Sequence, residues 1–352
     1  MGEPASGSFP LRAVLEIADI GELAPLAGYQ SQLLDVISAR LALGDDVLAV
    51  TAAIADANNL LTGRLLGLAE ARLGPPPCRY AWLVLGSQGR GEQVLSSDQD
   101  SAIAYESGHP TDESAIRAYF ATLSALVVNA LAQAGLPLCG GGFMATKWCR
   151  PMTEFQGLFH GWIGDPQPHA LLQAQVFLDV QTCFGDLPID PLENLLVAGG
   201  RRGPFKAQMA RAAVLFRPSL TWWGGLHPTR SAAGNVRALD IKKSGTAPIV
   251  LLARLYALAS GSAAHSTAER LRASLGTLSQ PDIDALIEAY RYLTGLRLGH
   301  QLVQVRAGLA ADNLIGTDQL SAADRKRLKQ ALHVIRDVQE ITAQNFATHT
   351  VT

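Results

Sequence analysis

Residues 81–105 read AWLVLGSQGRGEQVLSSDQDSAIAY, with two short apolar runs on either side of a polar segment. The first run, 82–85, is short enough to be a buried strand, and the second, 101–105, reads as another strand. Between them, the segment GSQGRG at 86–91 holds three glycines, which permit a tight turn and let the backbone approach a bound group closely. This stretch therefore predicts a strand, a glycine turn that faces a ligand, and a second strand.

Two acidic residues, Asp98 and Asp100, lie directly before the second predicted strand. Residues two apart on a strand point to the same face, so both carboxylates are expected to project toward the glycine turn. Two ionised carboxylates held this close repel each other, and a hard divalent cation such as Mg²⁺ or Mn²⁺ relieves that repulsion. The sequence predicts a phosphate-binding turn that faces a metal-binding carboxylate pair.

The spacing of these residues resembles the signature of the nucleotidyltransferase superfamily of the DNA polymerase β type, a Gly-Ser turn followed by an Asp-x-Asp pair. It is more closely similar to a bacterial nucleotidyltransferase family of the DUF294 type, with a core of roughly G-S-x-G-R-x-E-Q-x-x-x-x-D-Q-D, and more distantly to the PII uridylyltransferases. The matching positions are Gly86, Ser87, Gly89, Arg90, Glu92, Gln93, Asp98, Gln99 and Asp100. The alternative, a glycine hairpin with a solvated acidic end, leaves the matched Arg, Glu and Asp residues unexplained.

A second segment extends this resemblance toward the C-terminus. DIKKSGTAPIV at 240–250 resembles the D-[LI]-K-K-x-G-x-x-P-I-V segment of the substrate-binding domain that follows the transferase core in the same family. Residues 290–301, with Arg297, His300 and Gln301, resemble an R-L-x-x-Q-like stretch of that domain. The resemblance spans roughly 70 to 345 and leaves no room for a CBS or cyclic-nucleotide-binding module.

Apolar residues at helical spacing surround the motif. Residues 11–73 contain few helix breakers, and the acidic pair at 45–46 predicts the start of a long helix that ends at 73, before the GPPP linker at 74–77. The segment TDES at 111–114 is a helix start followed by an apolar stripe that ends near 134, which predicts a helix packed on the sheet. A strand and loop are expected at 136–147.

Together these patterns predict an α+β fold, with a small mixed-sheet nucleotidyltransferase core between an N-terminal helical lobe and a C-terminal helical domain. The expected boundaries are 1–74 for the N-terminal lobe, 75–190 for the core and 191–352 for the helical substrate-binding domain. The N-terminal lobe is a candidate for packing and for a homodimer contact.

Composition limits the class of protein. Of 352 residues, 48% are hydrophobic and 17% charged, which is typical of a soluble globular chain. The formal net charge of −2 gives no basic footprint for nucleic acid. The N-terminus does not read as a secretory signal, and the longest apolar stretch, 249–259, is interrupted by Arg254, so no membrane span is expected. Four cysteines without a CxxC pair predict free thiols in a reducing cytoplasm.

In the superfamily that the motif resembles, a third carboxylate normally completes the metal site on the strand after the helix. Here that region reads LCGGGFM at 138–144 and holds no acid, and the DUF294-type family carries a similar glycine-rich stretch. The third ligand is therefore Glu154 or Asp179, or it is absent. Asp179 lies in an apolar segment and equally suits an acid that pairs with an arginine.

Two aromatic features allow two interpretations each. Trp148, next to Lys147 and Arg150, either stacks a base beside phosphate-binding cations or belongs to the core. The pair at 222–223 is either an exposed platform or a buried plug.

The resemblance implies a Mg²⁺-dependent nucleotidyltransferase that moves a nucleoside monophosphate from an NTP to an acceptor hydroxyl, on a protein among other acceptors, and releases pyrophosphate. Asp98 and Asp100 would hold the metal ions. Ser87 and the backbone N–H groups of 86–89 would hold the β- and γ-phosphates.

Further cations are expected around the phosphates. Arg90 would add a bidentate contact, and Lys242 or Lys243 would reach in from the helical domain. Glu92 is interpreted as an acid that holds Arg90. Two other functions fit the same residues: a non-catalytic nucleotide sensor in signal transduction, and a helical scaffold with a decayed core, which the intact Asp pair disfavours.

Overall fold

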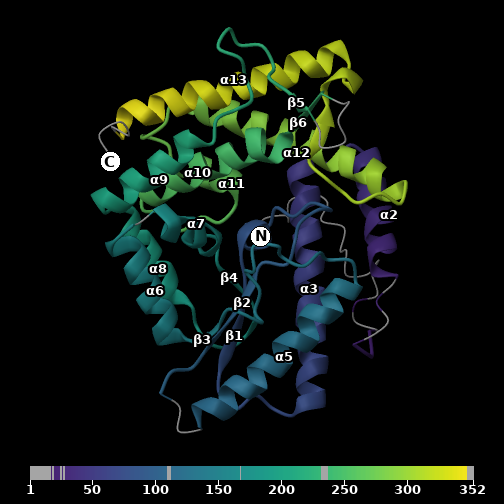
Figure 1. The fold of residues 1–352 in the computed structure, drawn as a ribbon, viewed down its shortest axis with the longest axis vertical. Coiled ribbons are helices and arrows are strands. Elements are labelled where there is room, and N and C mark those ends of the chain that lie inside the picture. Colours follow the sequence, from purple (N-terminus) through teal and green to yellow (C-terminus); the bar gives the residue numbers. More distant parts are fainter. Residues whose placement is uncertain are drawn as a thin grey trace, which may run out of the picture.

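The computed structural model describes residue 17, residues 20–23, residue 26, and residues 28–108, 112–166, 168–230 and 237–346. Most of the first part of the predicted N-terminal lobe therefore lies outside the described residues. The described chain forms a small mixed sheet with helices on both faces and a large helical region beside it (Figure 1). This confirms the predicted α+β fold.

The central sheet has the strand order β3-β2-β1-β4. Its strands are β1 (Tyr80–Val84), β2 (Ser101–Tyr105), β3 (Cys149–Pro151) and β4 (Gln181–Gly185). β1 is antiparallel to both β2 and β4, whereas β2 and β3 are parallel. The strands predicted on either side of the glycine turn are thus confirmed, and they pair directly with each other.

Both faces of this sheet are buried, because alternate residues of β1 and β2 enter two different apolar clusters. One cluster contains Ala81, Leu83, Ala102 and Ala104. The other contains Trp82, Val84, Ile103 and Tyr105. A sheet buried on both faces needs the continuous apolar runs that the sequence shows in these two strands.

Helices α3 (Val47–Leu73) and α5 (Glu113–Gln133) cover one face, and α2 (Tyr29–Ala42) packs on α3 (Figure 1). The side chain of Asp46 accepts a hydrogen bond from the Leu48 N–H and caps α3, and Asp112 caps α5 in the same way. Such N-caps satisfy backbone donors that have no partner in the first turn. The predicted helices therefore exist and begin at the acidic residues that the sequence indicated.

Helix α5 is long and apolar enough to cross a membrane, judged by length and composition alone. Four of its apolar side chains are instead fully or almost fully buried in the cluster with the sheet and α3, namely those of Ile116, Phe120, Leu123 and Val127. This is how a core helix of a soluble domain packs.

The other face of the sheet belongs to a cluster that continues through the C-terminal helices to Leu332 and Ile335 near the end of the described chain. Its helices are α6 (Met152–Gly164), α7 (Pro168–Phe177), α8 (Asp190–Gly200), α9 (Gly203–Leu215), α10 (Ala247–Ala259), α11 (Thr267–Arg272), α12 (Gln280–Arg306) and α13 (Ala322–Asn345). A small sheet of β5 (Thr229–Arg230), β6 (Arg237–Asp240) and β7 (Leu314–Gly316), followed by the short helix η3 (Thr317–Gln319), lies beside them. The core and the helical region thus share one apolar interior, while the predicted domain boundaries stay predictions.

One segment differs from its predicted structure, and a second contains an unusual helical turn. The region 136–147 forms a single isolated bridge, between Gln99 and Leu138, in place of a regular strand. The segment after Asp240 is helical: β6 ends at Asp240, a π-helical turn η2 (Lys242–Thr246) follows, and α10 begins at Ala247. Pro248 fits there because the first turn of a helix does not need its N–H group.

One buried carboxylate connects the turn after β1 to the C-terminal helices. Asp179 is fully buried, and its Oδ2 accepts a hydrogen bond from Arg254 Nη2 at 2.5 Å and its Oδ1 one from Arg270 Nη1 at 2.5 Å. Arg90 Nη1 also pairs with Oδ2. Burial alone would raise the pKa of the Asp179 carboxyl, but the charges of Arg254, Arg90 and Arg270 lower it well below its usual range.

A second buried acid extends this network. Glu92 accepts hydrogen bonds from Arg90 Nε at 2.7 Å, from the Thr267 N–H at 2.5 Å and from the Tyr290 hydroxyl at 2.8 Å. The prediction that Glu92 holds Arg90 is confirmed. The two acids together fix α10, α11 and α12 against the motif.

The Asp179 cluster should dominate stability. We expect Asp179→Asn to lower the free energy of unfolding by about 3–5 kcal/mol, because three buried guanidinium groups would lose the anion that they share. Urea unfolding at neutral pH measures this. Asp186→Asn is the matched control, since the Asp186–Arg79 pair has side chains 72% and 49% exposed and should contribute less than about 1 kcal/mol. Equal losses in the two variants would contradict the role given to Asp179.

Candidate functional site

A cavity of about 260 Å³ lies where the glycine turn, the acidic pair and the C-terminal helices meet. The turn and the segment before β2 supply one wall, and η2, α10 and α12 supply the opposite wall. Its polar lining residues include Ser87, Asp98, Asp100, Lys242, Tyr290 and Arg297. The structure therefore gathers residues from two distant parts of the sequence around one space.

The glycine turn is a single helical turn, α4 (Gly86–Gly89), directly after β1. Gly86 has φ +55°, and a Cβ there would lie 2.7 Å from Asp100 Oδ2. A Cβ at Gly89 would lie 1.8 Å from the carbonyl oxygen of Asp179. Both positions therefore need glycine, the first to place the carboxylate against the turn and the second for backbone packing.

The same turn leaves donors available at its start. The Gly89 N–H donates to the Leu85 carbonyl at 3.1 Å, whereas the first N–H groups of a helical turn have no acceptor within it. Ser87 lines the cavity, and its Oγ lies 3.4 Å from Ser97 Oγ. Of the predicted phosphate-binding residues at 86–89, Gly86 and Ser87 line the cavity, while the N–H of Gly89 is used within the fold.

Asp98 and Asp100 lie together, with the buried thiol of Cys139 beside them. One ligand atom from each of these three residues lies within 4.8 Å of the other two. Burial, and then the charge of Asp98, raise the pKa of the Asp100 carboxyl to about 6. Within the described part of the chain, neither carboxylate forms an ion pair.

This donor set fits a divalent cation. Two carboxylates without a cationic partner, at the wall of a cavity, are destabilised by their own repulsion, and a metal ion offsets it. Two oxygen ligands suit Mg²⁺ or Mn²⁺, and the sulfur adds a softer ligand.

The cations predicted to bind phosphate have different surroundings. The Arg90 side chain is 12% exposed and is held by Glu92 and Asp179. Lys242 is exposed and lines the cavity, where its charge lowers the pKa of Asp100 against the effect of burial. Lys243 does not line the cavity; its Nζ lies 3.8 Å from Asp240 and its side chain is 80% exposed.

Arg297 on α12 lines the same cavity, although the sequence marked it only as part of a family-like stretch. It is 8% exposed and has neutral partners, Asn313 Oδ1 at 2.6 Å and Ser96 Oγ at 3.3 Å. No carboxylate pairs with it among the residues that the structure describes. Burial lowers the pKa of its guanidinium to about 10, so it is still charged at neutral pH. A buried cation of this kind attracts an anion into the cavity.

The two acids considered for a third metal ligand lie in ion pairs. Asp179 lines the cavity, but both of its oxygens accept from arginines. Glu154 lies on the surface, where it pairs with Arg150 at 3.1 Å and Arg117 at 3.2 Å. Arginine pairing is thus the role in which the structure places Asp179.

The structure distinguishes between the two interpretations given above for Trp148 and for the aromatic pair at 222–223. The Trp148 ring packs against Phe143 and Phe177, with ring centroids 5.8 and 4.7 Å apart, and belongs to the core. Trp222 and Trp223 are 89% and 69% exposed and form a surface platform.

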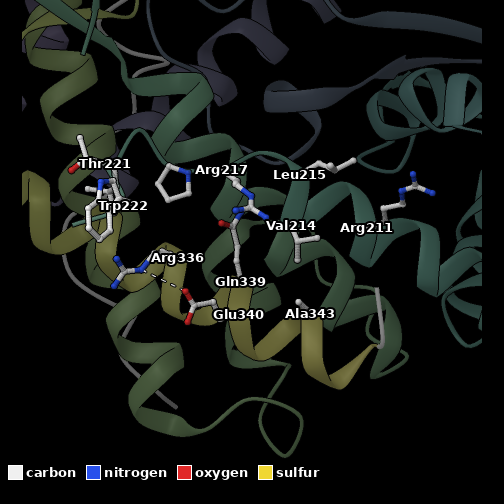
Figure 2. Close-up of a pocket in the computed structure, with 12 residues that line it drawn as sticks. Arg211, Val214, Leu215, Arg217, Thr221, Trp222, Arg336, Gln339, Glu340 and Ala343 are labelled. Atoms are coloured by element: carbon white, nitrogen blue, oxygen red, sulfur yellow. Dashed lines mark ion pairs between the residues drawn. The ribbon is translucent and has the colours of Figure 1, made fainter. Parts of the chain in front are cut away.

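A second cavity, of about 600 Å³, lies between the end of α9 with the segment after it and α13 (Figure 2). Its lining includes Trp222, Arg217 and Arg336, whose Nε lies 3.8 Å from Glu340 Oε1. Phe216 lines the first cavity, whereas its neighbours Leu215 and Arg217 line the second. The two cavities therefore adjoin, but the carboxylate pair belongs to the first.

Comparison with protein families gives two matches. Residues 31–169 match a model described as "Putative nucleotidyltransferase DUF294". Residues 203–346 match one described as "Putative nucleotidyltransferase substrate binding domain". No curated protein matches the chain. The first match contains the glycine turn and the acidic pair, and the second contains Lys242 and Arg297, so the cavity lies between the two matched regions.

The acidic pair should affect the metal-free protein in a pH-dependent way. A carboxyl with a raised folded-state pKa contributes stability below about pH 4 and loses it as pH rises through about 6. We expect Asp98→Asn/Asp100→Asn to leave stability in EDTA at pH 7.5 unchanged or raise it by about 1 kcal/mol, with a smaller difference at pH 4. Thermal melts at both pH values, with and without Mg²⁺, measure this. A Mg²⁺-dependent rise in melting temperature that survives in the variant would place the metal elsewhere.

Proposed function

Because the chain belongs to the DUF294 nucleotidyltransferase family, we propose that it transfers a nucleoside monophosphate from an NTP to an acceptor hydroxyl and releases pyrophosphate. The observation that carries this proposal is the pair Asp98 and Asp100, held against the glycine turn at the wall of a cavity that also contains buried Arg297. The negative phosphate chain of a nucleotide would balance the charge of Arg297, and a divalent cation would balance the charges of Asp98 and Asp100.

The transfer forms one bond and breaks another. The acceptor oxygen bonds to the α-phosphorus, the bond from that phosphorus to the oxygen bridging the β-phosphate breaks, and the electron pair leaves with pyrophosphate. The hydroxyl proton passes to solvent. Mg²⁺ or Mn²⁺, held by Asp98 and Asp100, would neutralise charge on the attacking and leaving oxygens.

The other residues bind and orient the donor. Ser87 and the first N–H groups of the turn would donate to phosphate oxygens, and Lys242 and Arg297 would balance the charge of the phosphate chain. Arg90 would act on the phosphates indirectly, by holding the turn in place through Glu92 and Asp179.

The acceptor side of the proposal is a protein hydroxyl in the cytoplasm. The net charge of −2 disfavours a nucleic-acid acceptor. The second cavity, with exposed Trp222 beside Arg217 and Arg336, offers a surface next to the reaction site on which a polypeptide could lie. A homodimer is part of the same proposal.

The alternative function is a nucleotide sensor that binds NTP without transferring it. It is favoured by one observation: no third carboxylate joins the acidic pair among the described residues. Such a protein would bind NTP with the same metal dependence but would label no acceptor.

Transfer activity separates these functions. The purified protein is incubated with each α-labelled NTP, Mg²⁺ and host lysate, and label on macromolecules is counted. We expect one NTP to give labelled product and Asp98→Asn/Asp100→Asn to lower it by several orders of magnitude, since metal stabilisation of the transition state is lost. Calorimetry should show weak NTP binding in EDTA. Metal-dependent binding without label transfer would establish the sensor, and label transfer by the double variant would contradict the proposed site.

Arg297 should govern binding of the phosphate chain. We expect Arg297→Met to weaken Mg·NTP binding about 10- to 100-fold, the effect of losing a charge-assisted hydrogen bond in a buried site, with little effect on nucleoside monophosphate binding. Lys243→Ala is the matched control, because it removes one positive charge outside the cavity. Calorimetry with a non-hydrolysable NTP measures both. If Lys243→Ala weakens binding and Arg297→Met does not, Arg297 is structural.

A further inference from the structure

Cys139 lies beside the acidic pair because its segment runs next to the segment that carries Asp98 and Asp100. Leu138 bridges Gln99 in parallel, and the Gln99 N–H donates to the Pro137 carbonyl at 2.9 Å. The segment that ends at Cys139 therefore runs alongside the segment that ends at Asp100. Side chains at directly opposite positions of two neighbouring extended segments lie close together. The thiol of Cys139 is therefore placed beside the acidic pair.

The chain after Cys139 fixes this position. The Cys139 carbonyl accepts from the Gly142 N–H at 3.1 Å, and Gly142 has φ +77°, so the glycine run forms a tight turn. The Ser101 N–H donates to the Phe143 carbonyl at 2.9 Å, and Ser101 Oγ accepts from the Ala145 N–H at 3.1 Å. The turn is thus tied to the start of β2, and Cys139 is 7% exposed with its sulfur within 4.8 Å of a carboxylate oxygen of Asp100.

The distances suit a shared ion. Asp98, Asp100 and Cys139 each offer one ligand atom within 4.8 Å of the others, and two atoms bound at about 2.1–2.4 Å to one ion lie no more than about 4.8 Å apart. Asp98 and Asp100 line a cavity that also holds Arg297, which is more than nine-tenths buried and has no carboxylate partner in the described chain. The cavity is therefore organised for a charged ligand.

We propose that Cys139 is the third ligand of the metal site and that this site binds thiophilic divalent cations, such as Co²⁺, Zn²⁺ and Cd²⁺, more tightly than Mg²⁺. The inference rests on the proposed function, because it assigns a ligand to the same metal site. Mg²⁺ takes oxygen ligands almost exclusively, whereas a thiolate raises affinity for softer ions. A thiol that coordinates a metal ion is deprotonated and releases its proton to solvent, so burial of neutral Cys139 in the metal-free protein is compatible with this role.

The test is spectroscopic and needs no transferase activity. Co²⁺ is added to the full-length protein, and near-ultraviolet absorption reports thiolate-to-cobalt charge transfer. We expect this band in the wild type and not in Cys139→Ser, while Cys183→Ser, which removes a half-buried thiol elsewhere, keeps it. Calorimetry should show Cd²⁺ binding more tightly than Mg²⁺ by at least about 10-fold in the wild type. Cys139→Asp should lose the band and narrow the preference for Cd²⁺ over Mg²⁺.

The outcomes separate this inference from the proposed function. If Co²⁺ binds without the band, or if Cys139→Ser keeps it, Cys139 is not a ligand, and transfer with Mg²⁺ can still be present. If the band depends on Cys139 and the protein transfers no nucleotide, the ligand assignment stands and the proposed catalysis fails. Circular dichroism checks that both Cys139 variants fold; Cys139→Asp gives a second measure if Cys139→Ser does not.

Discussion

The arrangement of the molecule depends on one buried anion, Asp179, and the three arginines around it. An isolated carboxylate in the interior is strongly destabilised, and so is an isolated guanidinium. Asp179 offsets both penalties for Arg90, Arg254 and Arg270 at once. Because these arginines come from the turn after β1, from α10 and from α11, the ion cluster requires the helical region to lie against the glycine turn. Burial of apolar side chains in the shared interior stabilises this arrangement further. Because the hydrophobic effect is non-directional, the ion cluster determines how the helical region is oriented.

This constraint divides the sequence motif into residues for folding and residues for chemistry. Arg90 and Glu92 match the family core, yet their side chains are used inside the network with Asp179, Thr267 and Tyr290. Asp98 and Asp100 face the cavity and form no ion pair with any residue that the structure describes. The cations available to a phosphate chain are Lys242 and Arg297, from the helical region. Under the proposed function, the region matched as a substrate-binding domain would therefore also help to hold the nucleotide donor.

Local patterns were sufficient to predict the strands beside the turn, helices α3 and α5 with their acidic caps, and the mixed α+β class, because each depends on residues close in sequence. Long-range partners were not predictable. The arginines that pair with Asp179 lie 75, 89 and 91 residues away along the chain, so no local pattern chooses between metal binding and ion pairing. Cys139 has no ligand spacing in the sequence, and only the bridge at Leu138 brings it to Asp100. The π-helical turn at 242–246 packs on α12 and α13, which lie far away in the sequence, and no local pattern indicated it.

The charges in the cavity explain why a nucleotide and a metal ion would bind there together. In the metal-free protein, Asp98 and Asp100 repel each other, and buried Arg297 forms no ion pair with a carboxylate among the described residues. Neither the negative nor the positive charges are therefore fully balanced. A triphosphate alone would satisfy Arg297 and Lys242 but would increase the repulsion with the two carboxylates. A divalent cation alone would satisfy the carboxylates and leave Arg297 as it is. The metal ion and the triphosphate together balance both carboxylates and both cations. Under the proposed function, this is the physical reason why each of the two ligands would bind more tightly in the presence of the other.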